Sequence, residues 1–277
     1  MEASTPSRSP AAASVPVRAI ASTTSRSAAL SRYCVCACMV FFHAYFVGVS
    51  AILQWLHRWR CRRQPRLFPP FTPTIMKLYY APGACSLAVH IALREVGVPF
   101  DLAAVDLAQH TTADGGDFYA VAPRGYVPVL ELADGSRHTE GAALLQHVAD
   151  LDPSQALIGA PGSPRRLAVV QWLTFVSTEL HKVFSPWLWH KETAESTRQW
   201  VKDRLAARFA ELEALFARQP WLAGDYSVAD AYAFTVINWA NLLALPLTPY
   251  PNLKAYLERV AARPKVQEAL RAEGLAK

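Results

Sequence analysis

The stretch Lys77-Leu-Tyr-Tyr-Ala-Pro-Gly-Ala-Cys85-Ser-Leu-Ala88 decides the fold of this chain. Lys77–Tyr80 has the character of a short strand, and the Pro-Gly turn after it leads into a helix that begins near Ser86. This order places the Cys85 thiol at a helix N-terminus, where unpaired backbone N–H groups stabilise a thiolate. The stretch therefore predicts an α/β unit that presents a cysteine with a lowered pKa. A buried cysteine that only fills space is the alternative.

The 277 residues carry a net charge of +6, but this charge is unevenly distributed. Residues 1–75 hold nine arginines and a single acidic residue, Glu2, so they carry +8 and residues 76–277 carry −2. The basic character belongs to this N-terminal extension, and it gives no support to nucleic acid as a partner. Four of the five cysteines also lie in the extension, so residues 76–277 cannot form an internal disulfide. We therefore expect a protein of a reducing compartment, the cytoplasm.

Residues 33–56 form an uncharged apolar segment that is followed directly by Arg58, Arg60, Arg62 and Arg63. Taken literally, this segment is long enough to cross a bilayer as a single-pass anchor with its C-terminal side in the cytoplasm. A membrane is thus a partner only if the segment belongs to the native protein. The lack of lysine and of turn or capping signals favours a second hypothesis, in which residues 1–75 are a disordered or non-native extension and the native chain starts at Met76.

Residues 76–277 divide into two compositions with a linker between them. The first, 76–151, alternates strand and helix signals and predicts a small α/β layer, with strands at 77–80, 100–105, 127–132 and 137–139 and helices at 86–96, 117–121 and 140–149. Residues 152–163 are rich in Pro, Gly and Asp, as is typical of a linker. Residues 164–277 repeat apolar side chains every three or four positions, which predicts a helical bundle. Its central helix is expected at 230–245, after a capping box at Ser227 and Asp230.

Five stretches in this order carry a resemblance to a known family: Met76–Leu87, Gly125–Leu130, Thr139–Gly141, Glu179–Lys182 and Ser227–Tyr232. Over residues 76–277 the chain resembles the cytosolic glutathione S-transferases, and in particular their bacterial beta class. The resemblance implies a thioredoxin-like glutathione-binding domain followed by an all-α helical domain that holds an electrophile pocket. It also implies a detoxifying transferase that forms a two-fold homodimer and uses glutathione as a co-substrate, with no further cofactor and no metal.

The resemblance assigns several glutathione contacts to the first domain. Val127 and a cis Pro128 would pair their backbone with the cysteinyl part of glutathione, whereas an ordinary edge-strand proline is the alternative. Glu140 and Gly141 open a helix whose N–H groups would bind the γ-glutamyl carboxylate, while the Glu140 side chain pairs with the ammonium; simple capping is the alternative. His110 stands where the beta class has a lysine for the glycyl carboxylate, and a neutral imidazole would hold that carboxylate less well. We interpret His90 as structural.

The first helix of the second domain carries a polar stripe made of Gln171, Thr174, Thr178 and His181. A solvent-facing surface is the ordinary explanation of such a stripe. The resemblance implies instead that Thr178, His181 and the adjacent Lys182 face the thiol across the cleft between the two domains, where binding sites are often found.

The implied mechanism is attack by a glutathione thiolate on an apolar electrophile, with Cys85 and His181 as the catalytic residues. Aromatic side chains could line the electrophile pocket, although such residues are more often part of a core: Trp172, Phe175, Phe184, Trp187 and Trp189. Two alternatives use the same scaffold. One is a glutathione-dependent thiol–disulfide reductase or peroxidase that works through Cys85, and the other is a non-catalytic carrier of apolar ligands.

Overall fold

The computed structural model describes residues 75–276. Its N-terminal half holds a five-stranded sheet in the order β3-β2-β1-β4-β5, in which β1 and β2 are parallel and the other neighbours are antiparallel. The strands are β1 (Met76–Tyr80), β2 (Phe100–Asp106), β3 (Thr111–Thr112), β4 (Val129–Glu131) and β5 (Arg137–His138). The two-residue β3 lies in a stretch that the sequence predicts as loop. β4 begins at Val129 and not at Val127, because Pro128 has no N–H to donate to the ladder.

The two faces of the sheet belong to different apolar clusters. Leu78 of β1 pairs with Leu130 of β4, and both are completely buried in the main core with the helices. The next pair, Tyr79 and Val129, points to the opposite face, where both pack in a smaller cluster with Phe118. This alternation follows directly from the two-residue period of a strand.

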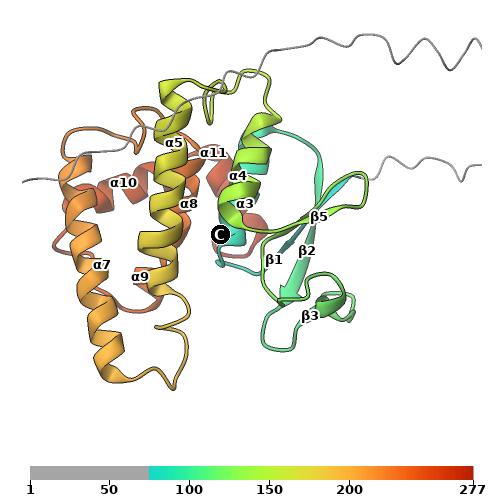
Figure 1. The fold of residues 1–277 in the computed structure, drawn as a ribbon, viewed down its shortest axis with the longest axis horizontal. Helices are drawn as coiled ribbons and strands as arrows, with labels where there is room; N and C mark the ends of the chain where they lie inside the picture. Colours follow the sequence, from blue (N-terminus) through green and yellow to red (C-terminus); the bar gives the residue numbers. More distant parts are fainter. Residues whose placement is uncertain (1–74, 277) are drawn as a thin grey trace, which may run out of the picture. The chain divides into compact units, whose positions relative to one another are not determined.

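Two helices cover the main face of the sheet, α3 (Ser86–Val96) and α4 (Gly141–Asp150). The sequence predicts the bounds of α3 correctly, and Gly97 ends it in the left-handed conformation at φ +78°. A short 3₁₀ helix, η1 (Phe118–Ala120), lies within the predicted helix 117–121. Figure 1 shows α3 and α4 between the strands and the helical half, and both helices contact α8.

The helical half follows the turns that end at Ser163, whose side chain accepts a hydrogen bond from the Arg166 N–H. Its elements are α5 (Pro164–Phe175), the π-helical segment η2 (Val176–His181), α6 (Lys182–Phe184), α7 (Glu195–Phe216), α8 (Val228–Ile237), α9 (Trp239–Leu242), α10 (Pro251–Ala261) and α11 (Pro264–Ala272). The sequence predicts a regular α-helix through Val183, whereas the structure has a π-helical turn at Val176–His181. Such turns are frequent at functional sites.

Every residue of α8 is buried, as its apolar sequence predicts. The predicted capping box at its start is present: the Asp230 carboxylate accepts hydrogen bonds from the Ser227 N–H and hydroxyl, and also from the Leu222 N–H and the Tyr256 hydroxyl. The predicted helix 230–245 is interrupted at Asn238, whose backbone and side-chain amides both donate to the Phe234 carbonyl. A short α9 follows this interruption.

The two halves also meet through α3, which contacts α11 near the end of the chain. His90 of α3 is fully buried, and its Nδ1 lies 2.8 Å from Glu273 Oε1. This contact supports a structural role for His90, as predicted. Among residues 75–276, no helix combines the length and apolar character that a membrane span requires. The candidate anchor 33–56 lies outside the described residues.

Candidate functional site

Cys85 and the Val127–Pro128 pair, predicted separately, lie side by side. Cys85 is the residue before α3 and is partly buried, and its Sγ donates a 3.2 Å hydrogen bond to the Val127 carbonyl oxygen. The Val127–Pro128 peptide bond is cis, as the resemblance implies. The strand-turn-helix motif and the loop before β4 thus form one wall of the candidate site.

The prediction of a lowered Cys85 pKa is wrong for this structure. Burial raises the pKa of the thiol to about 11. The N–H groups of Cys85 and Ser86 and the ammonium of Lys182 act in the opposite direction, but their combined effect is smaller than the cost of placing a thiolate among apolar neighbours. The helix N-terminus is therefore present, yet desolvation outweighs it, and Cys85 is a protonated thiol at neutral pH.

Glu140 begins α4 in an unusual backbone conformation. Its φ is +71°, which is costly for a residue with a Cβ, and such positions cluster at binding sites. The Glu140 carboxylate is exposed and accepts a 2.8 Å hydrogen bond from Arg124. Gly141 follows as the first residue of α4. The backbone thus turns sharply at the place where the resemblance puts the γ-glutamyl group.

His181, at the end of η2, is the centre of the second wall. Its Nδ1 lies 2.6 Å from the Tyr232 hydroxyl, and the Trp239 ring packs edge-on against the imidazole at 5.0 Å between centroids. Burial, together with Lys182, lowers the pKa of His181 to about 4, so the ring is neutral at pH 7. Tyr232 also reaches the start of α4, because a Cβ on Gly141 would lie 3.8 Å from its hydroxyl.

Tyr232 and Trp239 are site residues that the sequence reasoning did not select. Trp239 donates from its indole Nε1 to the Gly83 carbonyl oxygen, in the turn before Cys85, at 2.9 Å. The available signal was weak: a tyrosine and a tryptophan inside the almost wholly apolar stretch 230–245. Such side chains bring a polar group into a core and usually find a partner there.

The rest of the polar stripe is less involved. Thr174 and Thr178 are exposed, and each donates its hydroxyl to the carbonyl one turn earlier on its own helix, those of Val170 and Thr174. Gln171 is also exposed. Lys182 is exposed but close enough for its charge to lower the pKa of both Cys85 and His181. It is thus the cation of the site.

His110 lies in the turn between β2 and β3, with φ +51°. Its ring packs on Tyr119 at 4.5 Å between centroids, and both rings cover Gly125, where a Cβ would be only 2.7 Å from His110 Nδ1. That Nδ1 is buried and makes no hydrogen bond within the described residues. His110 therefore supports the loop that leads to Val127, and its predicted contact with a glycyl carboxylate stays a prediction.

The predicted aromatic pocket needs one correction. Phe184 is completely buried and packs edge-on against Trp239, so it belongs to the core because an apolar ring at this position faces the centre of the bundle. Trp187 and Trp189 are each 45% exposed, and Trp189 packs against Trp239 at 6.0 Å between centroids. Trp172 and Phe175 are partly buried and pack on each other.

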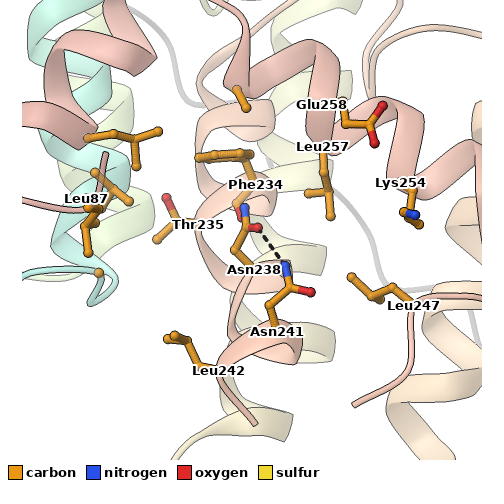
Figure 2. A pocket seen from close by; sticks show the side chains of 14 residues that line it. Leu87, Phe234, Thr235, Asn238, Asn241, Leu242, Leu247, Lys254, Leu257 and Glu258 are labelled. Atoms are coloured by element: carbon orange, nitrogen blue, oxygen red, sulfur yellow. Dashed lines mark hydrogen bonds between the residues drawn. The ribbon is translucent and has the colours of Figure 1, made fainter. Parts of the chain in front are cut away.

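A cavity of about 460 Å³ lies beside α8, and none of those five aromatic side chains lines it. Figure 2 shows Leu87 and Leu257 on either side of it, with Phe234 and Asn238 of α8 between them. Gly83 also lines this cavity, so it borders the turn before Cys85. Within residues 75–276, no three His, Cys, Asp or Glu side chains gather in an arrangement suited to a metal ion.

The family models for two domains match this chain. Residues 83–151 match the N-terminal domain of glutathione S-transferase, and residues 175–264 match its C-terminal domain. Together these ranges cover more than half of the chain. The match agrees with the observed thioredoxin-like half, which holds Cys85, and with the helical half that holds His181.

Individual relatives agree with this match. Glutathione S-transferase GstA of Escherichia coli O157:H7 is 42% identical over 201 residues, which are 72% of this chain and 100% of that relative. A sphingomonad glutathione S-transferase complexed with glutathione is 39% identical, with a TM-score of 0.69 over 72% of this chain and 100% of that one. The bacterial beta class glutathione S-transferase of Sphingomonas chungbukensis gives the same identity, TM-score and coverage. The chain therefore belongs to the glutathione S-transferase family, and it is a transferase enzyme of the bacterial kind.

Proposed function

We propose that this protein binds glutathione along the wall made by Cys85, Val127 and Gly141, and joins the whole glutathione molecule through its sulfur to an apolar electrophile. The observation that carries the proposal is the meeting of both halves at one point, where Tyr232 touches His181 and reaches the start of α4. The sphingomonad relative complexed with glutathione supports the choice of ligand.

Several backbone groups are suited to the contacts that we propose with glutathione. The N-terminus of α4 offers unpaired N–H groups to the γ-glutamyl carboxylate, and the Glu140 carboxylate is exposed to pair with the ammonium. Val127 and the cis Pro128 offer their backbone to the cysteinyl part, and the Lys182 ammonium supplies positive charge near the sulfur. His110 and Thr178 are the weaker candidates, because their described contacts are with their own loop and helix.

The reaction is a nucleophilic substitution or addition. The glutathione thiol loses its proton to solvent and the thiolate forms a carbon–sulfur bond. In a substitution the halide leaves with the bonding electron pair, and in an addition the resulting carbanion takes a proton from solvent. Free thiols are mostly protonated at pH 7, so the protein must stabilise the thiolate. His181 and the ammonium of Lys182 are suited to this, since a hydrogen bond and a positive charge both favour the charged form.

The raised pKa of Cys85 argues against the reductase or peroxidase alternative. Thiol–disulfide exchange needs a thiolate, and a thiol with a pKa of about 11 is almost entirely protonated at pH 7. Conjugation makes no such demand on Cys85, because the attacking sulfur belongs to glutathione. We therefore assign Cys85 a place beside the glutathione sulfur rather than the role of attacking group.

The full chain tests this proposal in a conjugation assay with glutathione and 1-chloro-2,4-dinitrobenzene. We expect glutathione-dependent turnover that falls about tenfold or more in His181→Ala, because one group that stabilises the developing charge is lost. The exposed His190→Ala is the matched control and should retain activity. Bound glutathione without turnover, together with reduction of a glutathione mixed disulfide, would favour the reductase. A folded protein that does not bind glutathione would favour the carrier.

The assembly and location follow from the same family. We propose a two-fold homodimer in the cytoplasm that acts in detoxification. Light scattering of the purified full chain tests the dimer, and cell fractionation tests the location. A monomer that still conjugates glutathione would contradict the first, and activity in the membrane fraction would contradict the second.

A further inference from the structure

The His181 ring is held on two sides by residues outside its own helix. The Tyr232 hydroxyl lies 2.6 Å from Nδ1, and the two rings are almost perpendicular, at 89°. The Trp239 ring packs against the imidazole from another side. Tyr232 is only 2% exposed, so water does not compete for this short contact. The orientation of the ring is thus fixed.

The direction of the Tyr232–His181 hydrogen bond follows from the chemistry of the two groups. A phenol O–H donates more strongly than an imidazole N–H, and an imidazole nitrogen accepts more strongly than a phenol oxygen, so the Tyr232 hydroxyl is the donor across the 2.6 Å contact. Burial raises the pKa of Tyr232 further from neutrality, and the imidazole is neutral, so a phenol O–H meets an unprotonated Nδ1.

We propose that Tyr232 is a positioning residue that fixes His181 in the tautomer with its proton on Nε2. His181 then acts on the glutathione sulfur as a hydrogen-bond donor through Nε2–H, and not as a base. A neutral imidazole with Nδ1 occupied has no free lone pair for the thiol proton, but its Nε2–H stabilises a thiolate. This inference rests on the proposed function and names the role of one residue in it.

Nitrogen NMR of the histidine rings tests the tautomer without any activity measurement. With ¹⁵N-histidine in the full chain at pH 7, the His181 signals should correspond to a protonated Nε2 and an unprotonated Nδ1. His181→Gln identifies these signals by their loss. In Tyr232→Phe the two His181 nitrogens should shift toward the averaged values of a free imidazole. A wild-type Nδ1 that carries the proton would overturn the proposal, even if conjugation proceeds.

Kinetics gives the second readout. Tyr232→Phe should lower kcat for conjugation about tenfold while KM for glutathione changes less than about twofold, because the ring loses orientation and not its binding surface. The matched control is Tyr226→Phe, since the buried Tyr226 hydroxyl makes no hydrogen bond within the described residues. An unchanged kcat in Tyr232→Phe would overturn the proposal. If both tyrosine variants unfold, the wild-type NMR spectrum decides the question alone.

Discussion

The indole Nε1 of Trp239 donates a 2.9 Å hydrogen bond to the carbonyl oxygen of Gly83, although 156 residues separate them. On its other side, the Gly83 N–H donates to Glu273 Oε2 at 3.0 Å. The turn that precedes Cys85 is therefore clamped by two residues of the helical half. Because Trp239 also packs on His181, this one side chain contacts both the turn before the thiol and the imidazole.

Trp239→Phe should weaken both the turn and the site. The variant loses the hydrogen bond to Gly83 and part of a buried ring, and we expect a cost of about 1–3 kcal/mol in the free energy of unfolding. We also expect a lower kcat for conjugation, since the His181 ring loses one of its supports. Thermal unfolding and the conjugation assay measure these effects. The control is the exposed Trp200→Phe on α7, and equal effects in both variants would contradict a special role for Trp239.

Glu273→Ala should lower the free energy of unfolding more than the removal of a surface carboxylate does. The Glu273 carboxylate is fully buried and serves both His90 Nδ1 and the Gly83 N–H, while Arg94 donates to the other His90 nitrogen. Removal of the carboxylate leaves the His90 Nδ1–H and the Gly83 N–H without an acceptor, and at about 1–3 kcal/mol for each buried unpaired donor we expect a loss of about 2–5 kcal/mol. Urea unfolding at pH 7 measures the loss.

Glu268→Ala on the same helix is the matched control for Glu273→Ala. Glu268 forms its ion pairs with Lys265 and Arg94 at the surface, where water screens them, so this variant should change the unfolding midpoint little. A similar small change in Glu273→Ala would show that the buried contact does not stabilise the fold.

Local patterns in the sequence predict the elements that carry the site. The strand-turn-helix stretch predicts α3 with its observed bounds, and the pair Ser227 and Asp230 predicts the observed capping box. Both features depend on residues that lie only a few positions apart, so they can be read directly from the sequence. The cis Val127–Pro128 bond follows from the family resemblance, not from any local pattern.

The features that the sequence does not predict depend on distant contacts. The Tyr232–His181 pair joins residues 51 positions apart, and the π-helical turn before His181 arises inside a stretch of regular spacing. The Cys85 pKa shows the same limit. Sequence reasoning finds the helix N-terminus that lowers it, but the burial that raises it comes from the packed fold.

Cys85 should react slowly with an alkylating agent at neutral pH. Only the thiolate is nucleophilic, and a pKa of about 11 leaves far less thiolate at pH 7 than an ordinary cysteine has. Alkylation by iodoacetamide should be about a hundredfold slower at pH 7 than in the urea-unfolded chain, and it should accelerate up to pH 10. Mass spectrometry of the Cys85 peptide follows this residue separately from the other four cysteines. Faster reaction in the folded protein would restore the prediction of a lowered pKa.

The Cys85→Ala variant should separate two activities of the site, conjugation and thiol–disulfide exchange. If Cys85 lies beside the glutathione sulfur without attacking the electrophile, the variant should lose any exchange with a glutathione mixed disulfide and keep most of its conjugation. The two assays are run on the same preparation, with Ser86→Ala avoided because the Ser86 hydroxyl is buried and hydrogen-bonded to the turn at Ala81. Equal loss of both activities would contradict this division.

His181 should make the stability of the protein depend on pH in a known direction. Its pKa falls from about 6.5 in the unfolded chain to about 4 in the fold, so between these values the unfolded state binds more protons. The contribution of His181 to the free energy of unfolding is therefore fully present above pH 6.5. It is lost as the pH falls toward 4, and the loss is about 3 kcal/mol at most. Urea unfolding at pH 7 and pH 5 should show a smaller difference for His181→Gln than for the wild type. Many carboxylates titrate in the same range, so the comparison with the exposed His190→Gln isolates the contribution of His181. If His181→Gln and the wild type lose equal stability between pH 7 and pH 5, the buried imidazole is not held neutral by the fold.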